Sequence, residues 1–161
     1  MKTKVLFVCL GNICRSPMAE AIFKHRTATE LPFLDFTVDS CGTSAYHIGE
    51  PPDARTVAVT KRHNIEIAHA ARQVEFNDFL MFDYVVAMDK HNLKDLEHTF
   101  SQVPNAKAQL LMMRQFDPQH PGADVPDPYY GGKDGFEEVY AILDRCSTGL
   151  IAHIQAEQGK A

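Results

Sequence analysis

The sequence predicts an α/β fold built around a parallel sheet, and three observations carry this prediction. Residues 3–8 form a short, nearly continuous apolar run, which is typical of a strand buried on both faces of a parallel sheet. Predicted helices and further predicted strands then alternate along the chain, as right-handed crossovers between parallel strands require. The last segment, 134–154, has the apolar spacing of a long amphipathic helix.

The first helix follows the first strand closely. Ser16 and Pro17 form a helix start, with Ser16 as the N-cap and Pro17 at the first helical position. The buried stripe of this helix is expected to comprise Met18, Ile22 and His25. A second strand is predicted at 36–40.

The remaining elements continue the alternation. They are a helix at 52–63, a short helix at 76–80, a strand at 83–88, a helix capped by Asp89 that carries Leu93, Leu96 and Phe100, and a strand at 108–113. Asp134 is predicted to cap the last helix. The buried face of that helix is expected to comprise Phe136, Val139, Tyr140, Leu143, Leu150 and Ile154.

Two segments are favoured for a functional site. Ligands of open α/β sheets bind beyond the carboxyl ends of the strands, and Cys9 lies at the end of the first predicted strand. Residues 114–133 form a long connection rich in proline and glycine. Long loops in compact domains are often functional, and prolines stiffen them.

Composition excludes several classes of protein. A length of 161 residues suits one domain spanning 1–161. The net charge of −5 argues against a nucleic-acid partner, and no apolar run reaches membrane-spanning length. The chain has four cysteines but no Cys-x-x-Cys pair and no histidine at ligand spacing to a cysteine, so we expect neither zinc nor structural disulfides. A cytoplasmic, reducing location is therefore expected.

The stretch from Cys9 to Ser16, with the sequence CLGNICRS, carries the chemistry. A loop between a buried strand and a helix start points backbone N–H groups inward at a positive helix terminus, which favours a dianion such as phosphate. Gly11 permits a backbone conformation that a side chain would resist. Arg15 can fold back over the loop, and its planar fork can bind two phosphate oxygens. We call residues 9–16 the phosphate loop.

The same surroundings make Cys9 a candidate nucleophile. Inward N–H groups, an arginine and a helix N-terminus all stabilise a thiolate, which is the nucleophilic form of cysteine. Ser16 can donate a hydrogen bond to this thiolate. The departing alkoxide or phenoxide then needs a proton from elsewhere in the chain. Asp127, in the sequence DPYY on the stiff long loop, is the best candidate, and Asp124 is a nearby competitor.

These motifs resemble the low-molecular-weight protein tyrosine phosphatase family. The phosphate loop at the N-terminus and the distant Asp-Pro-Tyr-Tyr element both match that family. Further matches cover nearly the whole chain, at 39–40, 42–43, 46–47, 71–73, 82–84 and 88–89. A bare Cys-x5-Arg pattern is weak, because short patterns recur by chance, but the full combination is specific.

The resemblance implies a four-stranded parallel sheet with helices on both faces, no metal, no cofactor and a two-step reaction. Cys9 would attack phosphorus while Asp127 protonates the leaving oxygen, and Asp127 would then activate water to release phosphate. Arg15 and the loop N–H groups would hold the equatorial oxygens.

The resemblance also implies roles for the surrounding residues. Asn12 would brace the loop, with Ser40 as its partner, and Tyr46 and Tyr129 would form opposite walls around a phenyl ring. Cys14 matches a second loop cysteine that can form a reversible disulfide with Cys9. The substrate-binding positions implied in the loop are Leu10, Gly11, Asn12, Ile13, Cys14 and Ser16.

Two other functions compete. An arsenate reductase shares this loop, but it needs resolving cysteines near the middle of the chain, and residues 70–100 contain none. A phosphate-binding module would not need a nucleophile and an acid together. The expected partner is therefore a phosphotyrosine protein or a small aryl phosphate, bound by a monomer or weak dimer.

Overall fold

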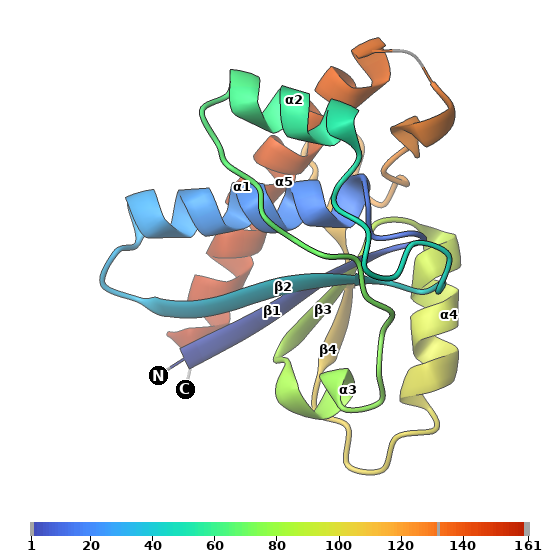
Figure 1. Cartoon of the computed structure of the whole chain (residues 1–161). Coiled ribbons are helices and arrows are strands. Elements are labelled where there is room, and N and C mark those ends of the chain that lie inside the picture. Colours follow the sequence, from blue (N-terminus) through green and yellow to red (C-terminus); the bar gives the residue numbers. More distant parts are fainter. Residues whose placement is uncertain (1, 132, 160–161) are drawn as a thin grey trace.

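The computed structural model describes residues 2–131 and 133–159. Four parallel strands form one sheet in the order β2-β1-β3-β4. Their bounds are β1 Lys2–Cys9, β2 Asp35–Gly42, β3 Tyr84–Ala87 and β4 Gln109–Met112. The predicted parallel α/β architecture is confirmed (Figure 1).

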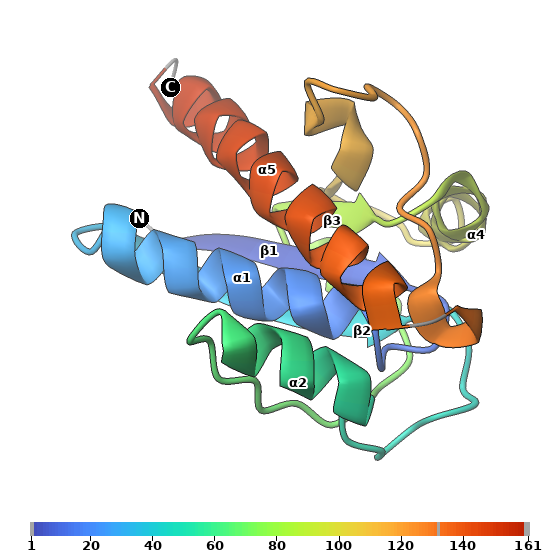
Figure 2. The ribbon, with the colours of Figure 1, turned by 90° about the horizontal axis from the view of Figure 1, so that it is seen from above.

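Helices cover both faces of the sheet. They are α1 Arg15–Glu30, α2 Ala54–Arg62, α3 Asp78–Met81, α4 Lys90–Phe100 and α5 Lys133–Gln158. Helices α1, α2 and α5 form one layer, and α3 and α4 lie on the opposite face (Figures 1 and 2). No helix in the described part of the chain is long and apolar enough to cross a membrane.

Each face of the sheet has its own apolar core. Alternate residues of β1 point to opposite sides, so Val5 and Phe7 pack beneath α1 and α5, whereas Leu6 and Val8 pack towards α3 and α4. All of these side chains are fully buried. Burial on both faces explains why the first strand has a continuous apolar sequence instead of an alternating one.

Several predicted element boundaries are wrong. Helix α1 begins at Arg15 with Cys14 at its N-cap position, so Ser16 lies inside the first turn and is not the cap. His25 is exposed and does not join the buried stripe. Helix α2 begins at Ala54 because the Asp53 carboxylate accepts the Arg55 N–H and caps it.

The C-terminal half follows the prediction more closely. Asp89 caps α4 by accepting the Asn92 N–H. Asp134 lies in the first turn of α5 and is not its cap. The long connection at 114–133 holds two short 3₁₀ turns, Met113–Phe116 and Pro128–Tyr130, and brings the second of these to the carboxyl end of β1.

Candidate active site

Cys9 ends β1, and the chain then turns sharply into α1. The Asn12 N–H points at Cys9 Sγ over 3.3 Å, and Ser16 Oγ lies 3.0 Å from the same sulfur. Because α1 begins at Arg15, the positive end of its backbone dipole also faces the loop. The local sequence therefore surrounds one sulfur with hydrogen-bond donors and positive charge, as a thiolate requires.

Asn12 holds the phosphate loop in shape. Its φ of 60° lies in the left-handed region, which asparagine tolerates better than most residues. Its side-chain NH₂ donates to Ser16 Oγ at 2.8 Å and to Ser40 Oγ at 3.0 Å. Its side-chain oxygen accepts from the Arg72 N–H at 3.0 Å and from His69 Nε2 at 2.7 Å. The structure thus brings Ser40 to the loop, and sequence reasoning missed Arg72 in this role.

Two glycines allow close approaches to the loop. A Cβ on Gly42 would lie 2.6 Å from the Leu10 carbonyl oxygen, so only glycine lets the end of β2 pass beneath the loop. Gly11 was expected to adopt a special backbone conformation, but the positive φ falls on Asn12. Gly11 instead provides space, because its Cβ would lie 2.9 Å from the His47 ring.

Arg15 joins the phosphate loop to two distant segments. Its Nη1 donates to Asp89 Oδ2 at 2.7 Å and to the Val125 carbonyl at 3.0 Å, and its Nη2 lies 3.7 Å from Asp127 Oδ2. Burial alone would lower the pKa of Arg15, but the Cys9 thiolate and the two carboxylates raise it above its usual value. The guanidinium is therefore a fixed, permanently charged group at the loop.

Asp127 lies opposite the phosphate loop on the segment 124–129, which we call the acid loop. The Tyr129 N–H donates to Asp127 Oδ1 at 3.1 Å and orients the carboxylate. The side chain remains one-third exposed. Asp124, the competing candidate, accepts the Lys90 N–H and does not line the cavity next to Cys9.

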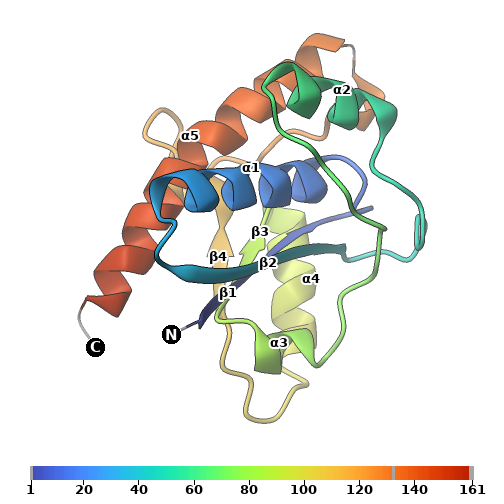
Figure 3. The same cartoon turned by 60° about the vertical axis from the view of Figure 1, so that its left-hand side comes forward.

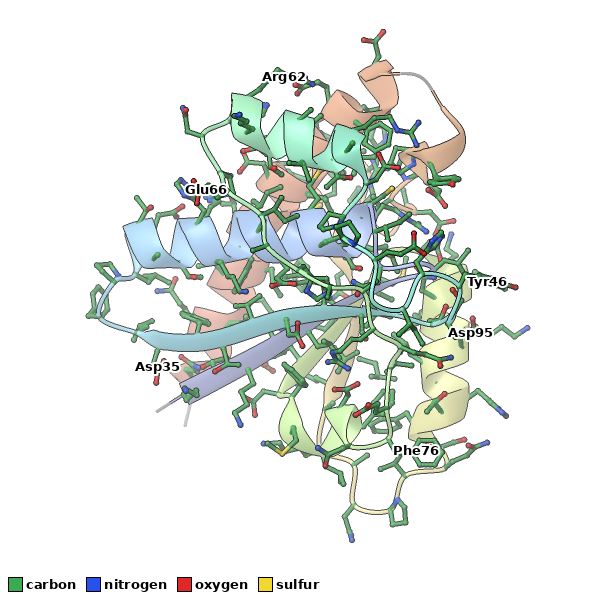
Figure 4. All side chains as sticks on the ribbon, viewed as in Figure 1. Asp35, Tyr46, Arg62, Glu66, Phe76 and Asp95 are labelled. Carbon is green, nitrogen blue, oxygen red and sulfur yellow. The ribbon has the colours of Figure 1, made fainter. Side chains whose placement is uncertain are left out.

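A cavity of about 120 Å³ opens above the phosphate loop. It is lined by Cys9, Leu10, Gly11, Asn12, Ile13, Cys14, Arg15, Tyr46, His47, Asp127 and Tyr129. Figure 4 shows Tyr46 pointing outward from the loop after β2. Ser16 and Ser40 lie beneath the loop and are fully buried. The sequence-predicted residues therefore meet at one place, at the carboxyl end of β1.

Sequence reasoning gave no role to His47, which also lines the cavity. Its Nδ1 lies 2.8 Å from Glu50 Oε2, and its ring centroid lies 6.3 Å from that of Tyr129. The family match at residues 46–47 assigned no role to this histidine. The structure places His47 at the cavity because the loop after β2 lies beside Gly11.

The family model described as low molecular weight phosphotyrosine protein phosphatase matches residues 4–160. The chain belongs to this family. Over 147 residues it is 46% identical to a human member of that name, covering 91% of this chain and 92% of the relative. A member from Streptomyces coelicolor, named a low molecular weight protein-tyrosine-phosphatase, is 43% identical and is covered over 99% of its length.

Solved structures share the fold of this low molecular weight phosphatase chain. A protein tyrosine phosphatase from Entamoeba histolytica superposes with a TM-score of 0.85 at 39% identity, covering 99% of both chains. A Drosophila arginine phosphatase superposes with a TM-score of 0.88 at 34% identity, covering 94% of this chain and 98% of the other. Two substrate classes are therefore named among proteins of this shape.

The other cysteines of this family member are buried thiols. All four cysteines are free. Burial, and then the Asp53 carboxylate, raises the pKa of Cys14 to about 12. Burial likewise raises the pKa of Cys146 to about 12 and that of Cys41 well above its usual value. Cys41 and Cys146 lie in the core.

One group of side chains among the described residues has the composition of a metal site. Donor atoms of Glu20, Asp39 and His69 lie within 4.8 Å of one another behind the phosphate loop. Their carboxylates already pair with Lys24 and Arg72, and His69 Nε2 donates to the asparagine of the loop. These contacts make the group part of the support for the loop.

Proposed function

We propose that this phosphatase hydrolyses phosphotyrosine and other aryl phosphate monoesters through a cysteinyl-phosphate intermediate. The observation that carries the proposal is the single cavity that Cys9, Arg15 and Asp127 line together with two tyrosines. The names of the human and Streptomyces relatives support the substrate class. The cavity combines a nucleophile, an anion site and a proton donor, which is the set that phosphoryl transfer needs.

In the first step, the Cys9 thiolate attacks phosphorus in line with the ester oxygen. The P–O bond to the aryl group breaks, its electron pair goes to the leaving oxygen, and Asp127 supplies a proton to that oxygen. Arg15 and the N–H groups of the loop bind the equatorial oxygens, where the charge of the transition state is spread. A cysteinyl phosphate and a neutral phenol result.

In the second step, Asp127 is a carboxylate and takes a proton from an attacking water. The P–S bond breaks, its electron pair returns to Cys9, and inorganic phosphate forms. Ser16 Oγ, 3.0 Å from the sulfur, stabilises the departing thiolate. Cys9 and Asp127 therefore act in both steps of the reaction, and the enzyme returns to its starting state.

The lining of the cavity favours an aromatic leaving group. Tyr46 and Tyr129 can contact a phenyl ring by offset or edge geometry, and Ile13 adds apolar surface at the loop. Phosphoarginine is the competing substrate, because a solved relative of similar fold is named an arginine phosphatase. A guanidinium can also stack on an aromatic face, so the preference for aryl phosphates rests on the names of the relatives that are 46% and 43% identical.

Phosphate release from three substrates tests the proposal. Wild type and Cys9→Ser are compared on p-nitrophenyl phosphate, phosphotyrosine and phosphoarginine, in EDTA with a thiol reductant. We expect wild type to turn over both aryl phosphates and to prefer them to phosphoarginine. We expect the serine variant to be inactive while still binding inorganic phosphate. Turnover by Cys9→Ser would contradict the proposed mechanism. A preference for phosphoarginine would contradict the proposed substrate class.

We also propose that residues 1–161 act as one phosphatase domain in the cytoplasm. The four cysteines are free thiols, and free thiols persist in a reducing compartment.

A further inference from the structure

We propose that Arg55 is a positioning residue that holds the proton donor Asp127 at the distance the first step needs. This inference rests on the proposed function. It comes from a chain of contacts that runs from the phosphate loop, through the N-terminus of α2, to the acid loop. The sequence gives Arg55 no motif, and it does not line the cavity above Cys9.

The first half of the chain of contacts ties Arg55 to the phosphate loop. The Asp53 N–H donates to the Ile13 carbonyl at 2.8 Å, which joins the start of α2 to that loop. Arg55 Nε and Nη2 then donate to the two carboxylate oxygens of Asp53, each at 3.0 Å. This paired geometry fixes the plane of the guanidinium, and the arginine lowers the pKa of Asp53.

The second half ties Arg55 to the acid loop. Its Nη2 donates to the Tyr129 carbonyl at 3.2 Å, and its guanidinium carbon lies 5.5 Å from the centroid of the Tyr129 ring. The guanidinium also lies 4.6 Å from the ring centroid of Phe136, which is fully buried in α5. Contact with a core ring gives the arginine a rigid backing, and cation–π attraction holds it there.

Asp127 therefore lies between two fixed points of the acid loop. On its N-terminal side, the Val125 carbonyl accepts from Arg15, and the Val125 N–H donates to the Met88 carbonyl. On its C-terminal side, the Tyr129 carbonyl accepts from Arg55, and the Tyr129 N–H donates to Asp127 itself. Removing Arg55 breaks only the contact at the second point.

This arrangement predicts a specific chemical defect. A shift of the proton donor by about 1 Å can cost about 100-fold in rate when the proton transfer limits the reaction. A poor leaving group such as phenoxide needs that proton, whereas p-nitrophenoxide needs it little. Phosphate binding by the phosphate loop stays intact, because Arg55 does not touch it.

The test compares kcat/KM for phenyl phosphate and p-nitrophenyl phosphate in the full chain. The parameter kcat/KM is chosen because it reports the first chemical step. We expect Arg55→Ala to lose about 10-fold on phenyl phosphate and less than about 2-fold on p-nitrophenyl phosphate. Arg55→Lys, which cannot pair with both oxygens of Asp53, should lie between wild type and Arg55→Ala. The matched control is Arg62→Ala, on the same helix and paired with exposed Glu137, which should change neither value.

A double-mutant cycle shows whether Arg55 acts through Asp127. In an Asp127→Ala background, Arg55→Ala should cause no further loss on phenyl phosphate, because the group that it positions is already gone. Equal losses on both substrates, or a full additional loss in the Asp127→Ala background, would overturn the inference and leave the proposed function standing. An inactive wild type would instead overturn the proposed function and this inference with it.

Discussion

Asn12 determines the shape of the phosphate loop without carrying a charge. Both of its side-chain donors and both of its acceptor positions are used, and the residue is buried. An uncharged amide can meet two hydroxyls and two N–H groups at once, which neither an acid nor an amine can do. The sequence predicted its contact with Ser40, but His69 and Arg72 lie too far along the chain for any local pattern to assign them.

The surroundings of the four cysteines predict selective alkylation by iodoacetate at neutral pH. Only a thiolate reacts, and the raised pKa values of Cys14, Cys41 and Cys146 keep those sulfurs as buried thiols. We expect one modification per chain, at Cys9, and we expect inorganic phosphate to slow it. Fragment-ion mass spectrometry locates the label, since Cys9 and Cys14 share a tryptic peptide.

Equally rapid labelling of Cys14 would contradict this assignment. So would labelling at Cys9 that inorganic phosphate leaves unchanged, because the anion and the reagent would then occupy different places.

At the scale of helices and strands, the sequence predicts the kind of each element better than its ends. Helix α1 begins at Arg15 because the loop before it, with Asn12 at positive φ, already turns the backbone into the helix. The Ser-Pro pair is a sound local start pattern, but tertiary contacts use the serine hydroxyl at the nucleophile instead. Helix α2 begins later than predicted, at Ala54, because Asp53 caps it by a local hydrogen bond from the Arg55 N–H.

The acid loop is connected to α5 by a buried carboxylate. Asp117 accepts from Arg145 Nε and Nη2, from Arg114 Nε and from the Gln119 N–H. The bonds from Arg145, with those from Gln119 and Arg114, outweigh burial and hold the pKa of Asp117 well below its usual range. Arg114 also donates to the Asp124 carbonyl at 2.8 Å, at the start of the acid loop.

Asp117→Asn is therefore expected to destabilise the fold by about 3 kcal/mol at neutral pH. A carboxylate whose pKa is lowered in the folded state stabilises the fold at pH values above the ordinary aspartate pKa of about 4. It loses that contribution as the pH falls. The difference between variant and wild type should therefore shrink in acid. Urea unfolding at neutral and acid pH measures both quantities.

Asp144→Asn serves as the control for that measurement. Asp144 is about half exposed and lies 3.6 Å from Arg26, so its loss should cost less than about 1 kcal/mol. A loss of less than about 1 kcal/mol in unfolding free energy for Asp117→Asn would contradict the proposed role of the buried carboxylate. A loss that does not change with pH would contradict it as well.

At the scale of the whole molecule, the order β2-β1-β3-β4 places the first strand between the second and third. The chain crosses over in opposite directions from β1, so the loop after β1 lies at the point where strand order reverses. Figure 3 shows α1 leaving this edge of the sheet with β2 and β3 on either side of β1. The alternating pattern of the sequence placed Cys9 at the carboxyl end of the first strand, but it did not predict the strand order.

The long-range parts of the site could not be predicted in the same way. Cys9 and Arg15 form one local motif, and Asp127 belongs to a recognisable four-residue element. His47 and Arg55 reach the site from a surface loop and a helix start, and their roles depend on contacts with the phosphate loop or the acid loop. Such contacts exist only after the two core layers have packed.

The central claim is that Cys9 carries the phosphoryl group between the two steps. Wild type and Asp127→Ala are mixed with p-nitrophenyl phosphate, quenched in acid during turnover, digested and analysed by mass spectrometry. We predict an added phosphoryl group of about 80 Da on Cys9, in larger amount in Asp127→Ala because its second step lacks a base. Continued turnover with no phosphate on Cys9, or with phosphate on another residue, would contradict the account.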